Sequence, residues 1–122
     1  MKLTLLRHGD TEGSRNDLYY GAADIPVLPD SLETLAQRAS AGVYPTAALY
    51  YTSGLLRTEQ TIRALYGDVA HTQLPGLREM DFGDFEMKSY AELKDDPAFQ
   101  AWCEDAEHNA CPNGESAPQV LA

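Results

Sequence analysis

The sequence is poor in cysteine and in basic residues, and it has no long apolar run. Its two cysteines, Cys103 and Cys111, are too few for a disulfide framework, and no cysteine or histidine spacing is typical of zinc ligands. The apolar run before Arg7 is too short for a signal peptide, and no run approaches the roughly 20 residues of a membrane span. We therefore expect a soluble, cytoplasmic protein without a metal site.

Basic residues number 9 against 19 acidic ones, which gives a net charge of −10 over 122 residues. Nucleic acids and anionic membranes bind to basic surfaces, so this balance argues against both as partners. It does not exclude a small basic pocket for one phosphate group. Hydrophobic residues make up 43% of the chain and charged residues 23%, which is typical of a globular protein. The length predicts one domain, residues 1–122.

Apolar runs and helical spacing alternate along the chain. They predict strands at Leu3–Leu6, Ala47–Tyr51 and Val69–Leu74, and helices from Asp30 or Ser31 to Gly42 and over Leu55–Tyr66, Tyr90–Lys94 and Pro97–Glu107. Asp30 or Ser31 is expected to cap the first helix, and Pro97 to occupy the first turn of the last. This order predicts an α/β fold with a largely parallel sheet flanked by helices.

Polar residues follow the first two predicted strands. Arg7 and His8 come after Leu6, and Ser53 and Arg57 come after Tyr51. Ligands of open parallel sheets gather at the carboxyl ends of the strands, so these side chains are expected to share one rim.

These residue types suit the transfer of a phosphoryl group. A neutral imidazole can attack phosphorus, an arginine fork can bind two phosphate oxygens, and a carboxylic acid can protonate the leaving oxygen. Taken singly, each residue also has a plainer interpretation. His8 would end a strand, Arg57 would lie on a helix surface, and Glu79 would belong to a solvated acidic turn.

Four ordered blocks favour the chemical interpretation. They are Leu6-Arg7-His8-Gly9-Asp10-Thr11-Glu12, Tyr19-Tyr20-Gly21-Ala22-Ala23-Asp24-Ile25-Pro26, Thr52-Ser53-Gly54-Leu55-Leu56-Arg57-Thr58-Glu59-Gln60-Thr61, and Leu77-Arg78-Glu79-Met80-Asp81-Phe82-Gly83-Asp84-Phe85-Glu86. Together they closely resemble the motifs of the histidine phosphatase superfamily, which includes the phosphoglycerate mutases. The short last block resembles the α-ribazole phosphatase-like branch more than the mutases.

The resemblance implies a phosphoglycerate mutase-like fold and a phosphatase that acts on small phosphorylated metabolites. It implies that His8 becomes phosphorylated, that Arg7 and Arg57 bind the phosphoryl group, and that Glu79 donates a proton. Gly9, Thr11, Ser14 and Gly21 are implied as substrate-binding residues, and no metal or organic cofactor is implied. His71 and His108 match no motif and are expected to be ordinary surface histidines.

The sequence departs from the family pattern in several places. Ser14 stands where asparagine is usual, Ala22 where tryptophan is frequent, and Met87 where glycine is common. Asn113-Gly114-Glu115-Ser116 resembles the segment that opens the family's next helix, but no histidine follows it to serve as the second catalytic histidine. We therefore expect the final helix and strands to be missing and the 122-residue chain alone to turn over substrate poorly.

Two alternatives to the phosphatase stay open. One is a phosphoglycerate mutase-type transfer, in which phosphohistidine returns its phosphoryl group to a second hydroxyl. The other is a non-catalytic phosphate-binding fragment, which would associate with itself through an incomplete sheet edge.

Overall fold

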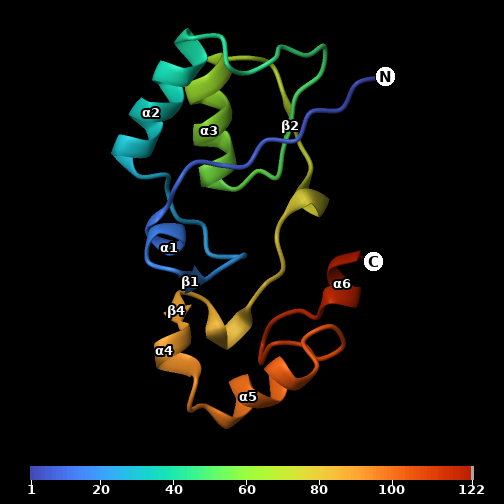
Figure 1. Ribbon diagram of the computed structural model, residues 1–122. Helices are drawn as coiled ribbons and strands as arrows, with labels where there is room; N and C mark the ends of the chain where they lie inside the picture. The colour runs from blue at the N-terminus through green and yellow to red at the C-terminus, as the bar shows by residue number, and fades with distance from the viewer. Residues whose placement is uncertain (122) are drawn as a thin grey trace. The chain divides into compact units, whose positions relative to one another are not determined.

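The computed structural model describes residues 1–121, which form two compact units (Figure 1). Unit 1 consists of Met1–Glu12 and Asp24–Leu77, and unit 2 consists of Gly13–Ala23 and the described residues from Arg78 onward. Both units are therefore assembled from separate stretches of the sequence. The short helix α1 (Glu12–Arg15) contains the first boundary between these stretches.

Unit 1 is built on two helices, α2 (Pro29–Ser40) and α3 (Leu56–Tyr66), which pack against each other. The strands β2 (Tyr51–Thr52) and β3 (Thr72–Gln73) pair in parallel, and the 3-10 helix η1 (Pro75–Leu77) follows them. Its buried apolar side chains are Val27, Leu35, Leu55 and Ile62. Because these side chains come from both helices and the segments before them, burial of apolar area holds the helix pair together.

The helix ends of unit 1 follow local rules. α2 begins one residue earlier than predicted, with Pro29 in its first turn and Leu28 as the capping residue without a side-chain cap. The prediction that Asp30 or Ser31 caps this helix was wrong, since the Ser31 hydroxyl instead accepts a hydrogen bond from the Asp10 amide. α3 ends at Tyr66 as predicted, and the next residue, Gly67, has a φ of 68° that glycine readily adopts.

The sheet of unit 1 is much smaller than the sequence predicts. Leu3–Leu6 forms no strand among the described residues, and the side chains of Leu3 and Leu5 are 77% and 84% exposed. The strands predicted at Ala47–Tyr51 and Val69–Leu74 are confirmed only in part, as Tyr51–Thr52 and Thr72–Gln73. A strand needs a hydrogen-bonded neighbour, and apolar composition alone does not supply one. The prediction of one largely parallel sheet is therefore confirmed only in part, because the described residues hold two separate two-stranded sheets, of which β2–β3 is parallel and β1–β4 is antiparallel.

Unit 2 contains short elements joined by turns. Its antiparallel strands are β1 (Leu18–Tyr19) and β4 (Lys88–Ser89), and its helices are η2 (Gly83–Phe85), α4 (Tyr90–Leu93), α5 (Pro97–Glu104) and α6 (Ala117–Leu121). The two predicted helices of this region are confirmed with earlier ends, and Pro97 begins α5 as expected. Asp96 caps α5 by accepting from the Ala98 amide, and Ser89 and Glu92 form a reciprocal capping box on α4.

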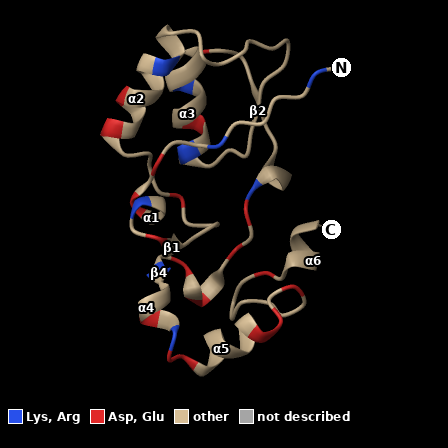
Figure 2. Ribbon diagram, viewed as in Figure 1, with Lys and Arg blue, Asp and Glu red and all other residues tan. Residues whose placement is uncertain are grey.

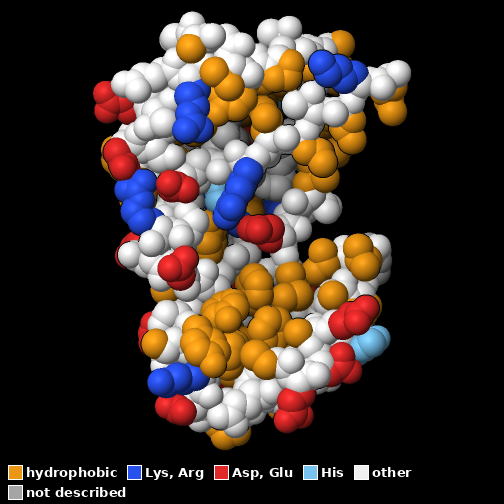
Figure 3. Space-filling model, viewed as in Figure 1, with side chains coloured by type: hydrophobic (Ala, Val, Ile, Leu, Met, Phe, Trp, Pro, Cys, Tyr) orange, Lys and Arg blue, Asp and Glu red, His pale blue; other side chains and the backbone are white. Residues whose placement is uncertain are grey.

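An aromatic cluster forms the core of unit 2. Phe85 and Phe99 are 1% and 2% exposed, and their ring centroids lie 5.4 Å apart at an interplanar angle of 84°. Such edge-to-face pairs contribute about 1 kcal/mol beyond their buried area. Tyr19, Met80, Phe82 and Trp102 pack against this core. Figure 3 shows hydrophobic side chains gathered on the visible face of unit 2, and Figure 2 shows acidic residues along the stretch from α4 to α5.

No helix among residues 1–121 is both long enough and apolar enough to cross a membrane.

Candidate active site

His8 lies in the extended segment that opens unit 1, and its side chain is half-buried. Its Nδ1 atom is 2.7 Å from the carbonyl oxygen of Gly9. A carbonyl oxygen only accepts, so Nδ1 is the donor in this contact and carries a proton. In the neutral form of such a ring the lone pair is on Nε2, which is the atom able to attack an electrophile.

The backbone on either side of Gly9 is fixed by unit 1. The Gly9 amide donates to Oγ1 of Thr61 at 3.0 Å, and the Asp10 amide donates to Oγ of Ser31 at 2.9 Å. The Asp10 carbonyl accepts from the Leu28 amide at 2.8 Å. Hydrogen bonds to both α2 and α3 therefore hold the segment that carries His8.

Thr11 continues this ordered segment. It is fully buried, and it forms an isolated antiparallel bridge with Val27. The Val27 amide in turn donates to Oε1 of Gln60 at 2.7 Å. The structure therefore packs the predicted substrate-binding residue Thr11 inside unit 1.

Arg57 is 1% exposed and occupies the first turn of α3. The amino end of a helix carries partial positive charge, so a cation there is electrostatically unfavourable unless an anion is nearby. Burial raises that cost, because a buried charge needs a compensating partner. A guanidinium fork has the geometry to bind two oxygens of an anion such as phosphate.

The loop before Arg57 is ordered by side-chain oxygens. Oγ of Ser53 lies 3.4 Å from the Leu55 amide and 3.2 Å from Oγ1 of Thr58. Oδ1 of Asp24 accepts from the Leu56 amide at 2.7 Å, so a carboxylate from a distant loop caps α3. These contacts fix the direction in which α3 begins and therefore the place of Arg57.

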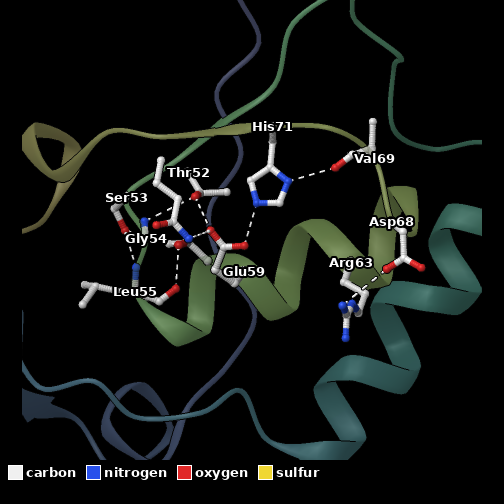
Figure 4. A network of polar contacts seen from close by, with 11 residues as sticks. Thr52, Ser53, Gly54, Leu55, Glu59, Arg63, Asp68, Val69 and His71 are labelled. Atoms are coloured by element: carbon white, nitrogen blue, oxygen red, sulfur yellow. Dashed lines mark hydrogen bonds and ion pairs between the residues drawn. The ribbon is translucent and has the colours of Figure 1, made fainter.

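A polar network joins α3 to both strands of unit 1 (Figure 4). The carboxylate of Glu59 accepts from Oγ1 of Thr52 at 2.6 Å, from Nε2 of Gln73 at 2.9 Å and from Nε2 of His71 at 2.6 Å. Burial acts to raise the pKa of Glu59, but these hydrogen bonds outweigh it and lower the pKa. The structure therefore gives His71, which the sequence marks as an ordinary surface residue, a specific partner.

The four remaining predicted site residues are divided between the two units. Arg7 is exposed in unit 1, whereas Glu79, Ser14 and Gly21 belong to unit 2. Glu79 is exposed in the turn between η1 and η2. The bonds of Gly9 and Thr61 thus connect His8 with Arg57 inside unit 1.

Gly21 lies in a crowded backbone turn of unit 2. A Cβ atom at this position would lie 1.8 Å from the carbonyl oxygen of Met80, so only glycine fits. The Gly21 amide donates to the carboxylate of Glu86, with 2.9 Å to Oε1 and 3.1 Å to Oε2. The turn is thus held both by close packing and by a charge-assisted hydrogen bond.

The sequence did not predict that Glu86 orders a loop of unit 2. Besides Gly21, its carboxylate accepts from the amides of Ala22 at 2.8 Å, Ala23 at 3.3 Å and Phe82 at 3.0 Å. One carboxylate therefore shapes the loop that carries the predicted substrate-binding residue Gly21. Its membership of the acidic block was the only sequence signal, because the contacts themselves are to backbone groups.

Cys111 and His108 are two further titratable side chains, both in unit 2. Burial raises the pKa of the Cys111 thiol to about 11, with Asp81 adding to the effect, so the thiol is protonated at neutral pH. His108 is exposed and its Nδ1 lies 2.9 Å from Oδ1 of Asp105. Within residues 1–121, no group of three or more histidine, cysteine or acidic side chains is placed to hold a metal ion.

Known proteins resemble this chain in sequence. The family described as "Histidine phosphatase superfamily (branch 1)" matches residues 3–122. The chain is 34% identical over 120 residues to the adenosylcobalamin/alpha-ribazole phosphatase of Escherichia coli, covering 94% of this chain and 59% of the relative. It is 27% identical over 130 residues to a 2,3-bisphosphoglycerate-dependent phosphoglycerate mutase of Beijerinckia indica, covering 98% of this chain and 62% of the relative.

Solved structures show the same relationship. The alpha-ribazole phosphatase of Shigella flexneri superimposes with a TM-score of 0.83 at 29% identity, over 94% of this chain and 59% of that one. A phosphoglycerate mutase of Thermus thermophilus gives a TM-score of 0.73 at 27% identity, over 93% and 63%. The chain thus has a phosphoglycerate mutase-like fold and spans about three fifths of these relatives. It belongs to branch 1 of the histidine phosphatase superfamily.

Proposed function

We propose that this chain carries the phosphoryl-accepting centre of a phosphatase that acts on small phosphomonoesters. The observation that carries the proposal is the hydrogen bond from Nδ1 of His8 to the Gly9 carbonyl, at 2.7 Å. It directs the lone pair of the neutral ring to Nε2, as attack on phosphorus requires. The buried Arg57 at the amino end of α3 supplies the matching positive charge.

The reaction takes place in two transfers. Nε2 of His8 attacks phosphorus, the phosphorus–nitrogen bond forms, and the bond to the substrate oxygen breaks. Arg7 and Arg57 bind the phosphoryl oxygens, and Glu79 gives its proton to the leaving oxygen. Water then attacks the phosphohistidine, the bond between nitrogen and phosphorus breaks, and a proton from the water returns to the Glu79 carboxylate, so that inorganic phosphate leaves and both the imidazole and the acid are restored.

The relatives support a choice of substrate class. The match to alpha-ribazole phosphatases at 34% identity favours a phosphate ester of a nucleoside-like metabolite, such as α-ribazole 5′-phosphate. The match to phosphoglycerate mutases at 27% identity supports a second candidate, transfer of the phosphoryl group to another hydroxyl. Release of free phosphate from α-ribazole 5′-phosphate, measured beside isomerisation of 3-phosphoglycerate, separates the two.

The direct test is formation of phosphohistidine. The protein is incubated with phosphoramidate, a small donor that phosphorylates histidine, and the modified residue is mapped by mass spectrometry under alkaline conditions. We expect an acid-labile phosphoryl group on His8 that is absent from His8→Asn. The matched control is His108→Asn, since His108 is an exposed histidine outside the site. Absence of phosphohistidine at His8, or equal labelling of His108, would overturn the proposal.

A further inference from the structure

The hydroxyl of Thr61 makes two hydrogen bonds in the interior of unit 1. Thr61 is 5% exposed and lies on α3, one turn after Arg57. Oγ1 donates to the carbonyl oxygen of Arg57 at 2.7 Å and accepts from the amide of Gly9 at 3.0 Å. A carbonyl only accepts and an amide only donates, so the direction of both bonds is fixed.

One of these bonds is common and the other is not. Threonine hydroxyls in helices often donate to the carbonyl four residues earlier, as Thr34 does to Asp30 in α2 at 3.0 Å. That bond alone would say nothing about function. The bond from Gly9 is different, because it joins residues 52 positions apart in the sequence. It attaches the segment of His8 to the helix of Arg57.

Gly9 links the Thr61 hydroxyl to the imidazole of His8 through two hydrogen bonds. Its amide is held by Thr61, and its carbonyl accepts the proton on Nδ1 of His8 at 2.7 Å. A Cβ at Gly9 would lie 2.8 Å from Cγ1 of Val27 and 2.9 Å from Cδ1 of Leu35, so the glycine is also in tight contact with the core. With both its amide and its carbonyl in hydrogen bonds, Gly9 leaves the ring of His8 little freedom to turn.

We propose that Thr61 is a positioning residue that sets the tautomer and orientation of His8 through Gly9. Through its hydrogen bond to the Arg57 carbonyl, Thr61 also holds the backbone of Arg57. The nucleophile and the phosphate-binding side chain are thereby aligned by the same residue. This inference rests on the proposed function. A misplacement of about 1 Å at a reacting group can lower a rate about 100-fold. Loss of the single buried hydroxyl of Thr61 can therefore lower the rate of phosphohistidine formation strongly.

The test compares three variants. Thr61→Val keeps the shape of the side chain and removes the hydroxyl, and Thr61→Ser keeps the hydroxyl and removes the methyl group. Thr34→Val is the matched control, because it removes the same kind of helix bond from α2. We expect Thr61→Val to slow phosphohistidine formation at His8 about 100-fold. Thr61→Ser and Thr34→Val are expected to remain close to the unaltered protein.

A second readout does not depend on the reaction. Long-range ¹H–¹⁵N spectra of the imidazole report which ring nitrogen carries the proton. We expect His8 to carry it on Nδ1 in the unaltered protein and in Thr61→Ser, and to show a mixture of tautomers in Thr61→Val. An unchanged tautomer together with an unchanged labelling rate in a folded Thr61→Val would overturn the role of Thr61.

Two measurements on the unaltered protein keep the inference testable if Thr61→Val does not fold. The Gly9 amide is expected to exchange slowly with solvent, and His8 to carry its proton mainly on Nδ1. A rapidly exchanging Gly9 amide, or a proton mainly on Nε2, would overturn the inference. Failure of the unaltered protein to form phosphohistidine would count against the proposed function, while the tautomers would still decide the role of Thr61.

Discussion

His71 and Glu59 form a hydrogen-bonded pair in unit 1, with Nε2 of the imidazole 2.6 Å from Oε2 of the carboxylate. Nδ1 of the same ring lies 2.9 Å from the carbonyl oxygen of Val69. Both ring nitrogens thus face acceptors, which only the doubly protonated imidazolium can satisfy. The pKa of His71 is accordingly raised, first by the Val69 carbonyl and then by Glu59.

This pair predicts how stability depends on pH. A raised pKa of His71 means that its contribution is complete below the ordinary histidine pKa and is lost as pH rises through the higher pKa of the folded state. A lowered pKa of Glu59 means that its contribution is complete above the ordinary glutamate pKa and is lost as pH falls through the lower folded value. The pair therefore stabilises the protein most between about pH 4.5 and 6.5.

We expect His71→Gln to lower the free energy of unfolding by about 1 kcal/mol at pH 6 and by less at pH 8.5, since the side chains are 23% and 26% exposed. Chemical denaturation at the two pH values measures this difference. His108→Gln is the control, because the exposed pair with Asp105 contributes little. An equal loss at both pH values for His71→Gln would contradict a charged His71.

Local rules explain which elements the sequence could predict. The prediction of a helix over Leu55–Tyr66 matches α3 to within one residue, because helical spacing and a terminal glycine are properties of the segment itself. The strand predicted at Leu3–Leu6 is absent from the described residues, because strand pairing depends on residues far away in the sequence. The apolar residues of this segment predict only that another part of the protein covers them, and not which part.

The same distinction applies to the site. Motifs singled out His8 and Arg57 as candidate site residues, because the chemistry of their side chains is visible in the residue type. Thr61 and Glu86 were missed as positioning residues, because both act on backbone amides that every sequence contains. A spacing of four between Arg57 and Thr61 was the only hint that the two share a helix face.

Glu86 is predicted to order the loop of Gly21. Glu86→Gln leaves one acceptor oxygen and places an amide donor against the backbone amides that the carboxylate now binds. We expect a loss of about 2 kcal/mol in unfolding free energy, as for other hydrogen bonds to charged groups. Faster hydrogen exchange at residues 21–23 is the specific readout. The exposed Glu107→Gln is the control, and unchanged exchange at this loop in a folded Glu86→Gln would contradict the prediction.

Glu79 is predicted to act as the proton donor of the proposed reaction. A donor matters most when the leaving oxygen is basic, so Glu79→Gln should slow hydrolysis of an alkyl phosphate about 100-fold or more. Hydrolysis of p-nitrophenyl phosphate, whose leaving group needs no proton, should change much less. The ratio of the two rates in Glu79→Gln and in the control Glu107→Gln measures the effect. An equal loss with both substrates would assign Glu79 another role.

Arg57 is predicted to contribute through the geometry of its guanidinium as well as its charge. Arg57→Lys keeps one positive charge at the amino end of α3 but loses the fork that binds two phosphate oxygens. Since a fully engaged arginine is worth roughly 10³–10⁵ in rate, we expect the substitution to slow phosphohistidine formation about 100-fold, the lysine retaining part of the effect.

Arg63→Lys is the control, because Arg63 lies on the same helix with its side chain 77% exposed. Labelling of His8 with phosphoramidate measures both variants after circular dichroism has shown that they fold. Equal rates would mean that charge alone suffices at this position, and the assignment of a two-oxygen contact to Arg57 would then be withdrawn.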